Sequence, residues 1–107
     1  MTDTIHLTSA ELAEVRDILA RRLPPNVAVF VFGSRAGGRI KPWSDLDLLL
    51  DGDARLSLRV LSDLAEDFDR SRLPWKVDLV DGSSISPEFR RIVDASKLPF
   101  DLTPAPD

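Results

Sequence analysis

The stretch from Val27 to Phe32, VAVFVF, is the part of this chain that most restricts its fold. It is an unbroken apolar run between the turn-forming Pro24-Pro25-Asn26 and Gly33-Ser34. A short apolar run with turn residues on both sides predicts a strand, and successive strand side chains point to opposite faces. Both faces of this strand must therefore be covered, as in sheets that carry helices on either side.

Helical periodicity and cap residues predict three helices around this strand. The first follows the capping-box sequence Thr8-Ser9-Ala10-Glu11 and stops at Pro24-Pro25. The second follows Asp53 as its cap and carries Leu56 on its apolar side. The third begins at Ser86-Pro87, and its apolar face is expected to consist of Phe89, Ile92 and Val93.

Two further strands are predicted, from Asp45 to Leu50 and from Trp75 to Val80, each followed by an Asp-Gly turn. The connection between the first two strands permits either a hairpin or a crossover, so a mixed sheet is expected. The predicted fold class is therefore α/β (or α+β), with a small mixed β-sheet covered by helices. The length of 107 residues fits one small domain, expected over residues 1–98, with a loose tail over residues 99–107.

Charge and composition exclude several classes of protein. The net charge of −4 argues against a sequence-independent nucleic-acid binder, which needs a basic face, although a nucleotide remains a possible small ligand. The chain has no cysteine, and it has no apolar run near the roughly 20 residues that span a bilayer. The acidic N-terminus lacks the apolar region of a signal peptide. We expect a cytoplasmic protein with no membrane or nucleic-acid partner.

Three aspartates are placed where a strand would not favour them. Asp45 and Asp47 alternate with leucines and therefore leave one face of their strand, and Asp78 lies opposite its apolar neighbours in the next strand. If the two strands are neighbours in register, the three carboxylates converge, which is unfavourable without a cation. Mg²⁺ takes oxygen ligands, and two ions about 3.5–4 Å apart can serve a phosphoryl transfer. The alternative for an isolated Asp-x-Asp is a solvated turn.

The Gly-Ser turn upstream of these aspartates suits a phosphate. Gly33 lets a ligand approach the backbone closely, and Ser34 can cap a short helix whose N–H groups face an anion. The same loop carries three cations that are either phosphate contacts or ordinary loop charges: Arg35, Arg39 and Lys41. Trp43 and Trp75 flank the predicted site; we expect both to pack, with base stacking as the alternative.

The combined pattern resembles the nucleotidyltransferase superfamily that includes DNA polymerase beta. The pattern is Gly33-Ser34, then Ser44-Asp45-Leu46-Asp47-Leu48, then a lone strand aspartate at Asp78. Its Gly-Ser-Arg-Ala-x-Gly and Ser-Asp-x-Asp-Leu forms resemble the minimal nucleotidyltransferase (MNT) branch, most densely over residues 29–52. The resemblance implies the nucleotidyltransferase fold.

The resemblance also implies roles for individual residues. Asp45 and Asp47 match the pair that binds Mg²⁺, and Asp78 matches the third carboxylate, which helps to bind the catalytic metal and activates the acceptor hydroxyl. The residues implied to bind the nucleotide are Gly33, Ser34, Arg35 and Ser44. The implied reaction is attack of an acceptor hydroxyl on the α-phosphate of ATP, with two Mg²⁺ ions and release of pyrophosphate.

Many proteins of the MNT branch are antitoxins that add AMP to a tyrosine of a HEPN-domain toxin. The resemblance therefore implies a HEPN toxin as partner in a hetero-oligomer, with AMPylation as the means of neutralisation. The chain contains no tyrosine, so such an acceptor must lie on the partner. The branch often ends in a Glu-Gly-containing segment with a tyrosine, whereas residues 92–100 here lack the Glu-Gly and end in Phe100.

Two other functions compete with this one. A non-catalytic antitoxin would neutralise its partner by binding alone, although three retained strand aspartates count against a decayed site. A small-molecule nucleotidyltransferase of the aminoglycoside-modifying type would need an additional helical domain to hold its acceptor, and a chain of this length has no room for one.

Overall fold

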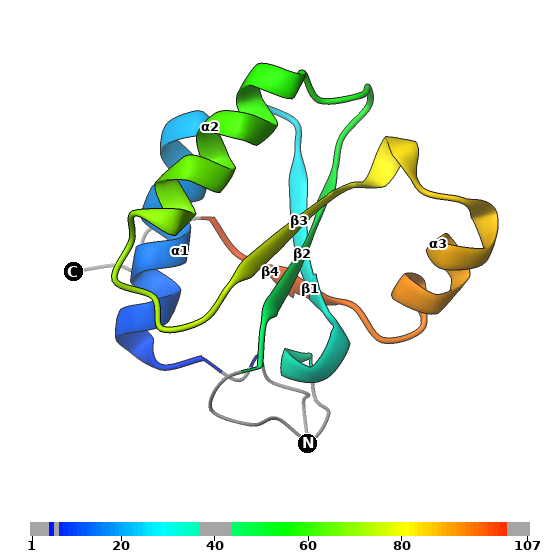
Figure 1. The fold of residues 1–107 in the computed structure, drawn as a ribbon. Helices are drawn as coiled ribbons and strands as arrows, with labels where there is room; N and C mark the ends of the chain where they lie inside the picture. Colours follow the sequence, from blue (N-terminus) through cyan, green and yellow to red (C-terminus); the bar gives the residue numbers. More distant parts are fainter. Residues whose placement is uncertain (1–4, 6, 37–43, 103–107) are drawn as a thin grey trace.

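The computed structural model describes residues 5, 7–36 and 44–102 (Figure 1). In chain order the elements are α1 (Ser9–Arg22), β1 (Ala28–Phe32), the short 3₁₀ turn η1 (Gly33–Arg35), β2 (Leu46–Asp51), α2 (Leu58–Asp69), β3 (Val77–Asp81), a second 3₁₀ turn η2 (Gly82–Ser84), α3 (Pro87–Asp94) and β4 (Leu98–Phe100).

The sheet is mixed, as the sequence predicts, with strand order β3-β2-β1-β4. The first strand, β1, is antiparallel to both β2 and β4, whereas β2 is parallel to β3. The parallel pair requires a crossover, and α2 supplies it. Both edges of β1 are paired, and helices cover both faces of the sheet (Figure 1), which explains why its sequence is apolar throughout.

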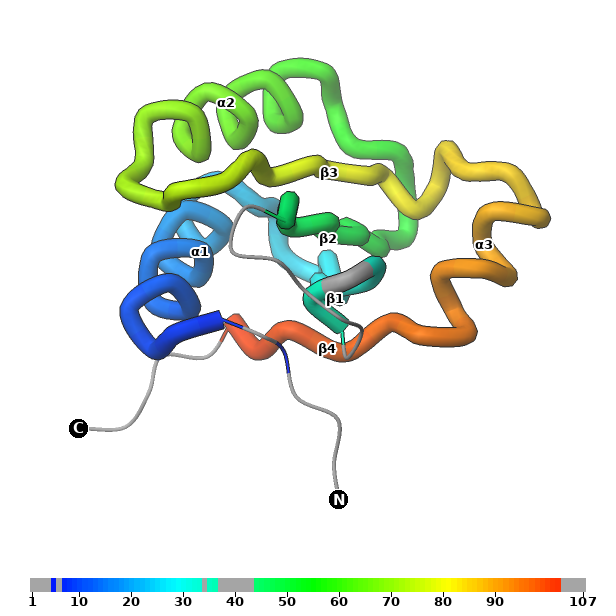
Figure 2. The backbone as a smooth tube through the Cα atoms, turned by 60° about the horizontal axis from the view of Figure 1, so that its bottom comes forward, coloured from blue at the N-terminus to red at the C-terminus, as the bar shows by residue number. Residues whose placement is uncertain are grey.

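Helices cover both faces of the sheet (Figure 2): α1 and α2 lie on one side and α3 on the other. The larger core lies between the sheet and the first two helices. Its fully buried members include Val15, Ile18, Leu19, Val31, Leu46, Leu48, Leu50 and Leu64. Leu49 and Val93 are also fully buried but belong outside this cluster. On the α3 side Phe32 meets Phe89 edge to face, with ring centroids 5.9 Å apart.

The helix caps confirm part of the local prediction and correct one element of it. The Thr8 and Glu11 capping box is present, and Ser86 caps α3 ahead of Pro87. The prediction that Asp53 caps the second helix is wrong, because Ser57 accepts the Val60 N–H and the helix begins at Leu58. In the connection before this helix, the Leu56 N–H donates a hydrogen bond to the buried side chain of Asp81.

The C-terminal end of the described chain also differs from expectation. Pro99 and Phe100, predicted to start a loose tail, pair with β1 as part of β4, and Phe100 is buried. This short strand contains a proline and no alternating pattern, so local propensity does not reveal it. Ile92, expected on the apolar face of α3, is instead 67% exposed.

Candidate active site

The predicted site forms where three strand ends meet. The chain leaves β1 at Phe32 and turns through η1, while β2 and β3 both begin at this end of the sheet. Strand register places Phe32 opposite Asp47, and Asp47 opposite Asp78. The antiparallel β1–β2 pair and the parallel β2–β3 pair thus bring the Gly-Ser turn and two strand aspartates, which are far apart in sequence, to the same end of the sheet.

Asp47 and Asp78 interact directly enough to change the titration of Asp47. The pKa of the Asp47 carboxyl is raised to about 6, chiefly by partial burial and then by the charge of Asp78, a hydrogen bond with Asp78 and the charge of Asp45. Within the described residues none of these three carboxylates forms an ion pair. The site therefore carries negative charge that the described part of the chain leaves uncompensated.

The three aspartates are not equally close. Asp45 precedes β2 and is exposed, and its charge contributes least to the shift at Asp47. No group of three or more His, Cys, Asp or Glu side chains among the described residues is arranged to hold a metal ion. The structure thus brings Asp47 and Asp78 together, and the metal-binding role of the three aspartates stays a prediction. Hard oxygen donors with uncompensated charge nevertheless suit Mg²⁺.

Gly33 has a specific structural reason for its place beside these carboxylates. Its φ of +74° lies in the left-handed region, and a Cβ built on it would lie 2.5 Å from Oδ2 of Asp47. A side chain here would both strain the backbone and displace the carboxylate. Gly33 therefore keeps the turn in contact with Asp47, and the close approach of a ligand to its backbone stays a prediction.

Arg35 is buried in this structure and bound to protein groups. It is 3% exposed, and its Nε and Nη2 donate hydrogen bonds of 3.0 and 2.9 Å to the carbonyl oxygen of Ser44. Its guanidinium also lies 4.3 Å from the ring centroid of Trp75. The expected packing of Trp75 is confirmed, since it is 9% exposed and belongs to the core cluster. A phosphate contact by Arg35 stays a prediction.

Other predicted residues are less fully placed. Ser44 lies just ahead of Asp45, partly buried, with its carbonyl occupied by Arg35. The side chain of Ser34 lies outside the described residues, as do Arg39, Lys41 and Trp43. The contact between Arg35 and Trp75 is absent from the sequence prediction, because no local pattern connects residues that far apart.

The opposite ends of β2 and β3 carry two more aspartates. Asp51 forms a two-pronged ion pair with Arg90 of α3, with hydrogen bonds of 3.1 and 3.2 Å. Asp81, 8% exposed, accepts hydrogen bonds from the backbone of Leu56 (2.9 Å) and Ser83 (3.0 Å). Burial alone would raise the pKa of Asp81, but these hydrogen bonds outweigh it and lower the pKa. Both aspartates are therefore structural.

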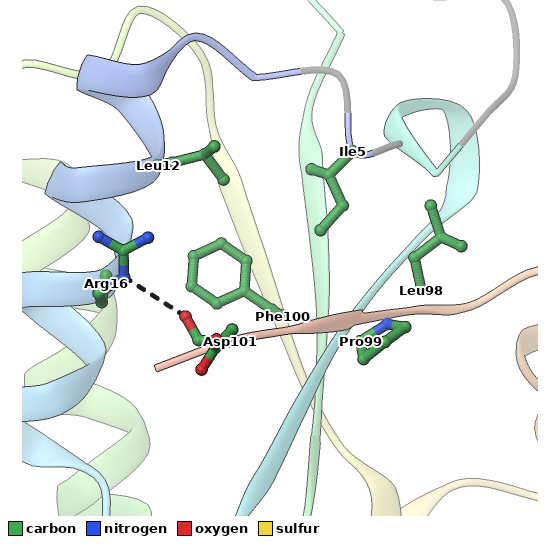
Figure 3. A pocket seen from close by; sticks show the side chains of 7 residues that line it. All are labelled: Ile5, Leu12, Arg16, Leu98, Pro99, Phe100 and Asp101. Atoms are coloured by element: carbon green, nitrogen blue, oxygen red, sulfur yellow. Dashed lines mark hydrogen bonds between the residues drawn. The ribbon is translucent and has the colours of Figure 1, made fainter. Parts of the chain in front are cut away.

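Two hollows lie near this sheet, beside its two opposite edge strands, β4 and β3. One of about 480 Å³ lies between α1 and β4 (Figure 3), is lined by Leu12, Leu98 and Phe100 among others, and has Arg16 bonded to the Asp101 carbonyl across it. Another of about 300 Å³ lies between α2 and β3 and includes Asp78 in its lining. The first is remote in sequence from every predicted site residue, whereas the second is lined in part by Asp78 alone of the three predicted carboxylates.

Comparison with known proteins points in one direction. The family model described as a nucleotidyltransferase domain matches residues 12–101. The chain is 42% identical over 89 residues to the probable protein adenylyltransferase MntA of Haemophilus influenzae. The aligned residues cover 83% of this chain and 77% of that protein. No helix in residues 5, 7–36 and 44–102 is long and apolar enough to cross a membrane.

Solved structures share the fold. A crystal structure of a toxin–antitoxin with AMP-PNP matches with a TM-score of 0.67 at 24% identity, covering 83% of this chain and 71% of that one. A tri-AMPylated Shewanella oneidensis HEPN toxin in complex with MNT antitoxin matches with a TM-score of 0.59 at 22% identity and the same coverage. At this identity the likeness shows a common arrangement of sheet and helices.

Proposed function

This chain belongs to the nucleotidyltransferase domain family, and from that premise we propose that it transfers AMP from ATP to a hydroxyl group of a partner toxin. The resemblance to the MNT branch, drawn from residues 33–48 and Asp78, is confirmed by the identity to MntA. The observation that carries the proposal is the pairing of Asp47 with Asp78 beside the Gly33 turn, without a cationic partner among the described residues.

The proposed reaction balances as a single displacement. The acceptor hydroxyl oxygen forms a bond to the α-phosphorus of ATP, the bond from that phosphorus to the bridging oxygen breaks, and pyrophosphate leaves. Asp78, exposed at the start of β3, takes the hydroxyl proton. The backbone of η1 holds the triphosphate, and Ser34 and Ser44 are the further residues that the family resemblance implies for nucleotide binding.

Asp45, Asp47 and Asp78 would hold Mg²⁺. An ion bound there would supply positive charge to the phosphate oxygens and to the attacking and leaving oxygens. The chain's own contribution is to keep the carboxylates aligned: Gly33 abuts Asp47, and the parallel register holds Asp78 across from it. Because the pKa of Asp47 is raised to about 6, binding of a cation at or below that pH would release a proton from this residue.

A partner protein supplies the acceptor in this proposal. The chain has no tyrosine, so a tyrosine acceptor lies on another molecule. The structural neighbours include a tri-AMPylated HEPN toxin bound to an MNT antitoxin and a toxin–antitoxin with AMP-PNP. These neighbours support a HEPN toxin as partner and ATP as donor, and therefore an antitoxin that acts in the cytoplasm by AMPylation.

The competing function is an antitoxin that neutralises by binding alone. Uncompensated carboxylates disfavour it, because repulsion between Asp47 and Asp78 costs free energy that a purely structural site would avoid. At the opposite ends of the same two strands, Asp51 and Asp81 show how this sheet satisfies aspartates that have only a structural role.

One experiment separates the two functions. Purified chain, the candidate HEPN toxin and ATP labelled at the α-phosphate are incubated with Mg²⁺ or with EDTA. We expect label on the toxin with the wild type and Mg²⁺, no label with EDTA or with Asp47→Asn, and full labelling with the control Asp53→Asn, an exposed aspartate in the turn after β2. Neutralisation of the toxin by Asp47→Asn as efficiently as by the wild type would overturn the catalytic proposal.

A further inference from the structure

Arg35 joins three separate segments of the candidate active site. It ends the turn that begins at Gly33, it donates two hydrogen bonds to the Ser44 carbonyl directly before Asp45, and it stacks on Trp75 ahead of β3. We define these three residues, Arg35, Ser44 and Trp75, as the Arg35 clamp. Each residue of the clamp lies within three positions of a predicted phosphate or metal ligand.

The clamp uses the particular chemistry of arginine. A buried cation is costly unless its donors are satisfied, and this guanidinium places two of them on one carbonyl. Its planar face covers the indole ring at 4.3 Å, a contact that favours a delocalised cation. A lysine would keep the charge but could reproduce neither the fork nor the planar stacking.

A backbone hydrogen bond also joins the segments next to Ser44 and Trp75. The Leu46 N–H donates to the Lys76 carbonyl at 2.9 Å, so the residue after Asp45 is tied to the residue after Trp75. Parallel pairing of β2 and β3 starts immediately beyond, with Leu46 opposite Val77. The clamp therefore sits at the first rung of the strand pair that carries Asp47 and Asp78.

We propose that Arg35 is a positioning residue that sets the spacing of Asp45 and Asp47 relative to Asp78, in place of the phosphate contact expected from the sequence. It acts through Ser44 and Trp75, which its side chain holds on either side of the β2–β3 junction. The inference rests on the proposed nucleotidyl transfer for its catalytic consequence, whereas its structural part stands independently. Misplacement of reacting groups by about 1 Å can cost on the order of 100-fold in rate.

The test compares Arg35→Lys with Trp75→Leu, which removes the ring that the guanidinium covers. Arg72→Lys, the same exchange at an exposed arginine, is the control. For both clamp variants we expect kcat to fall roughly 10- to 100-fold with a KM for ATP within about threefold of wild type. The double variant should be little worse than either single variant, because both break one connection. Trp75→Phe, which retains an aromatic face, should recover part of the rate.

A phosphate ligand would give a different result. Arg35→Lys would then raise the KM for ATP by tenfold or more, and Trp75→Leu would leave the KM unchanged. The effects of the two substitutions on the rate would add in the double variant. That outcome overturns the proposal.

Two further readouts do not depend on transfer. Amide hydrogen exchange at Leu46 should speed up at least tenfold in both clamp variants and stay unchanged in Arg72→Lys. Binding of Mn²⁺, followed by electron paramagnetic resonance, should weaken in both clamp variants. Unchanged Leu46 exchange and Mn²⁺ binding in a folded Arg35→Lys protein would refute the clamp even if AMP transfer were never observed. Faster exchange in a protein that transfers no AMP would refute the proposed function alone.

Discussion

The two ends of the β2–β3 pair carry the same residue types in opposite electrostatic states. At one end Asp47 faces Asp78, and a Cβ on Gly33 would lie 2.5 Å from the Asp47 carboxylate. At the other end a Cβ on Gly82 would lie 2.6 Å from the carboxylate of Asp51, which is paired with Arg90. A glycine abuts an aspartate in both places, yet the described residues neutralise one end of the pair and not the other.

The difference separates a carboxylate that stabilises the fold from one that is available for chemistry. Hydrogen bonds lower the pKa of Asp81, whereas burial and neighbouring charge raise the pKa of Asp47 to about 6. Groups that a structure leaves electrostatically unsatisfied cluster at functional sites, because substrate or metal supplies the missing charge. Four comparisons, taken from the largest expected effect to the smallest, test whether the two ends differ as described.

Asp47→Asn and Asp51→Asn should separate catalysis from folding most clearly. We expect Asp47→Asn to lower the initial rate of AMP transfer by roughly 10³-fold, because it removes a metal-binding charge beside the reacting phosphate. Asp51→Asn removes a charge paired with Arg90 and should leave the rate within a few-fold of wild type. Equal rate losses in the two variants, measured on folded protein, would contradict the comparison.

The two glycines should respond differently to the same added methyl group. Gly33→Ala puts a Cβ into the left-handed region and against the Asp47 carboxylate, so transfer should fall by roughly 100-fold. Gly82→Ala meets the ends of Asp51 and Arg90, and should reduce the free energy of unfolding by about 1–2 kcal/mol with little effect on the rate. Rate assays and urea unfolding of both variants check this pair of outcomes.

Asp81→Ala and Asp78→Ala should affect stability to different extents. Loss of the Asp81 carboxylate leaves the Leu56 and Ser83 N–H groups without their acceptor, which should cost about 2–3 kcal/mol in free energy of unfolding. Asp78 is exposed, and its replacement should change stability by under about 0.5 kcal/mol.

The pH dependence of the Asp81→Ala effect follows from the lowered pKa. The destabilisation should be largest above the pKa of an unfolded aspartate and should shrink as the pH falls through the lowered pKa of Asp81. Urea unfolding at pH 7 and at acid pH tests both statements. A larger loss for Asp78→Ala than for Asp81→Ala would reverse the assignment of the structural carboxylate.

The pH dependence of stability at Asp47 has the opposite sign. Because its pKa is higher in the folded than in the unfolded chain, Asp47 contributes stability that is fully present below the unfolded pKa. This contribution to the free energy of unfolding is lost as the pH rises through about 6. With EDTA present, Asp47→Asn should be more stable than wild type by about 1 kcal/mol at pH 8, after allowance for solvent screening, and equal to it near pH 3.

Added Mg²⁺ should reverse that advantage. It stabilises the wild type at pH 8 because it binds the folded carboxylates, and it should leave Asp47→Asn nearly unchanged. Thermal unfolding with and without Mg²⁺ at both pH values provides the measurement. A stability difference independent of both pH and Mg²⁺ would show that the ionised Asp47 carboxylate is not destabilised by burial and neighbouring charge.

Much of the fold and part of the site follow from local sequence. The Thr8 and Ser86 caps start their helices as predicted, and VAVFVF forms the central strand that its composition demands. Alternation with leucines places Asp47 correctly, because strand side chains alternate whatever the strand's neighbours are. The Asp53 cap failed because an alternative cap, Ser57, lies a few residues further along and Leu56 is held by Asp81.

The sequence by itself determined the helices, the three main strands and the strand positions of Asp47 and Asp78, because caps and periodicity act within a few residues. Only the tertiary structure decided which aspartates are satisfied: Arg90 reaches Asp51 and Leu56 reaches Asp81 from distant segments, and Asp47 meets Asp78 through strand register. It also decided that Phe100 joins the sheet and that Arg35 bonds Ser44 and covers Trp75. Charge compensation depends on which groups come within a few ångströms, and chain topology sets those distances.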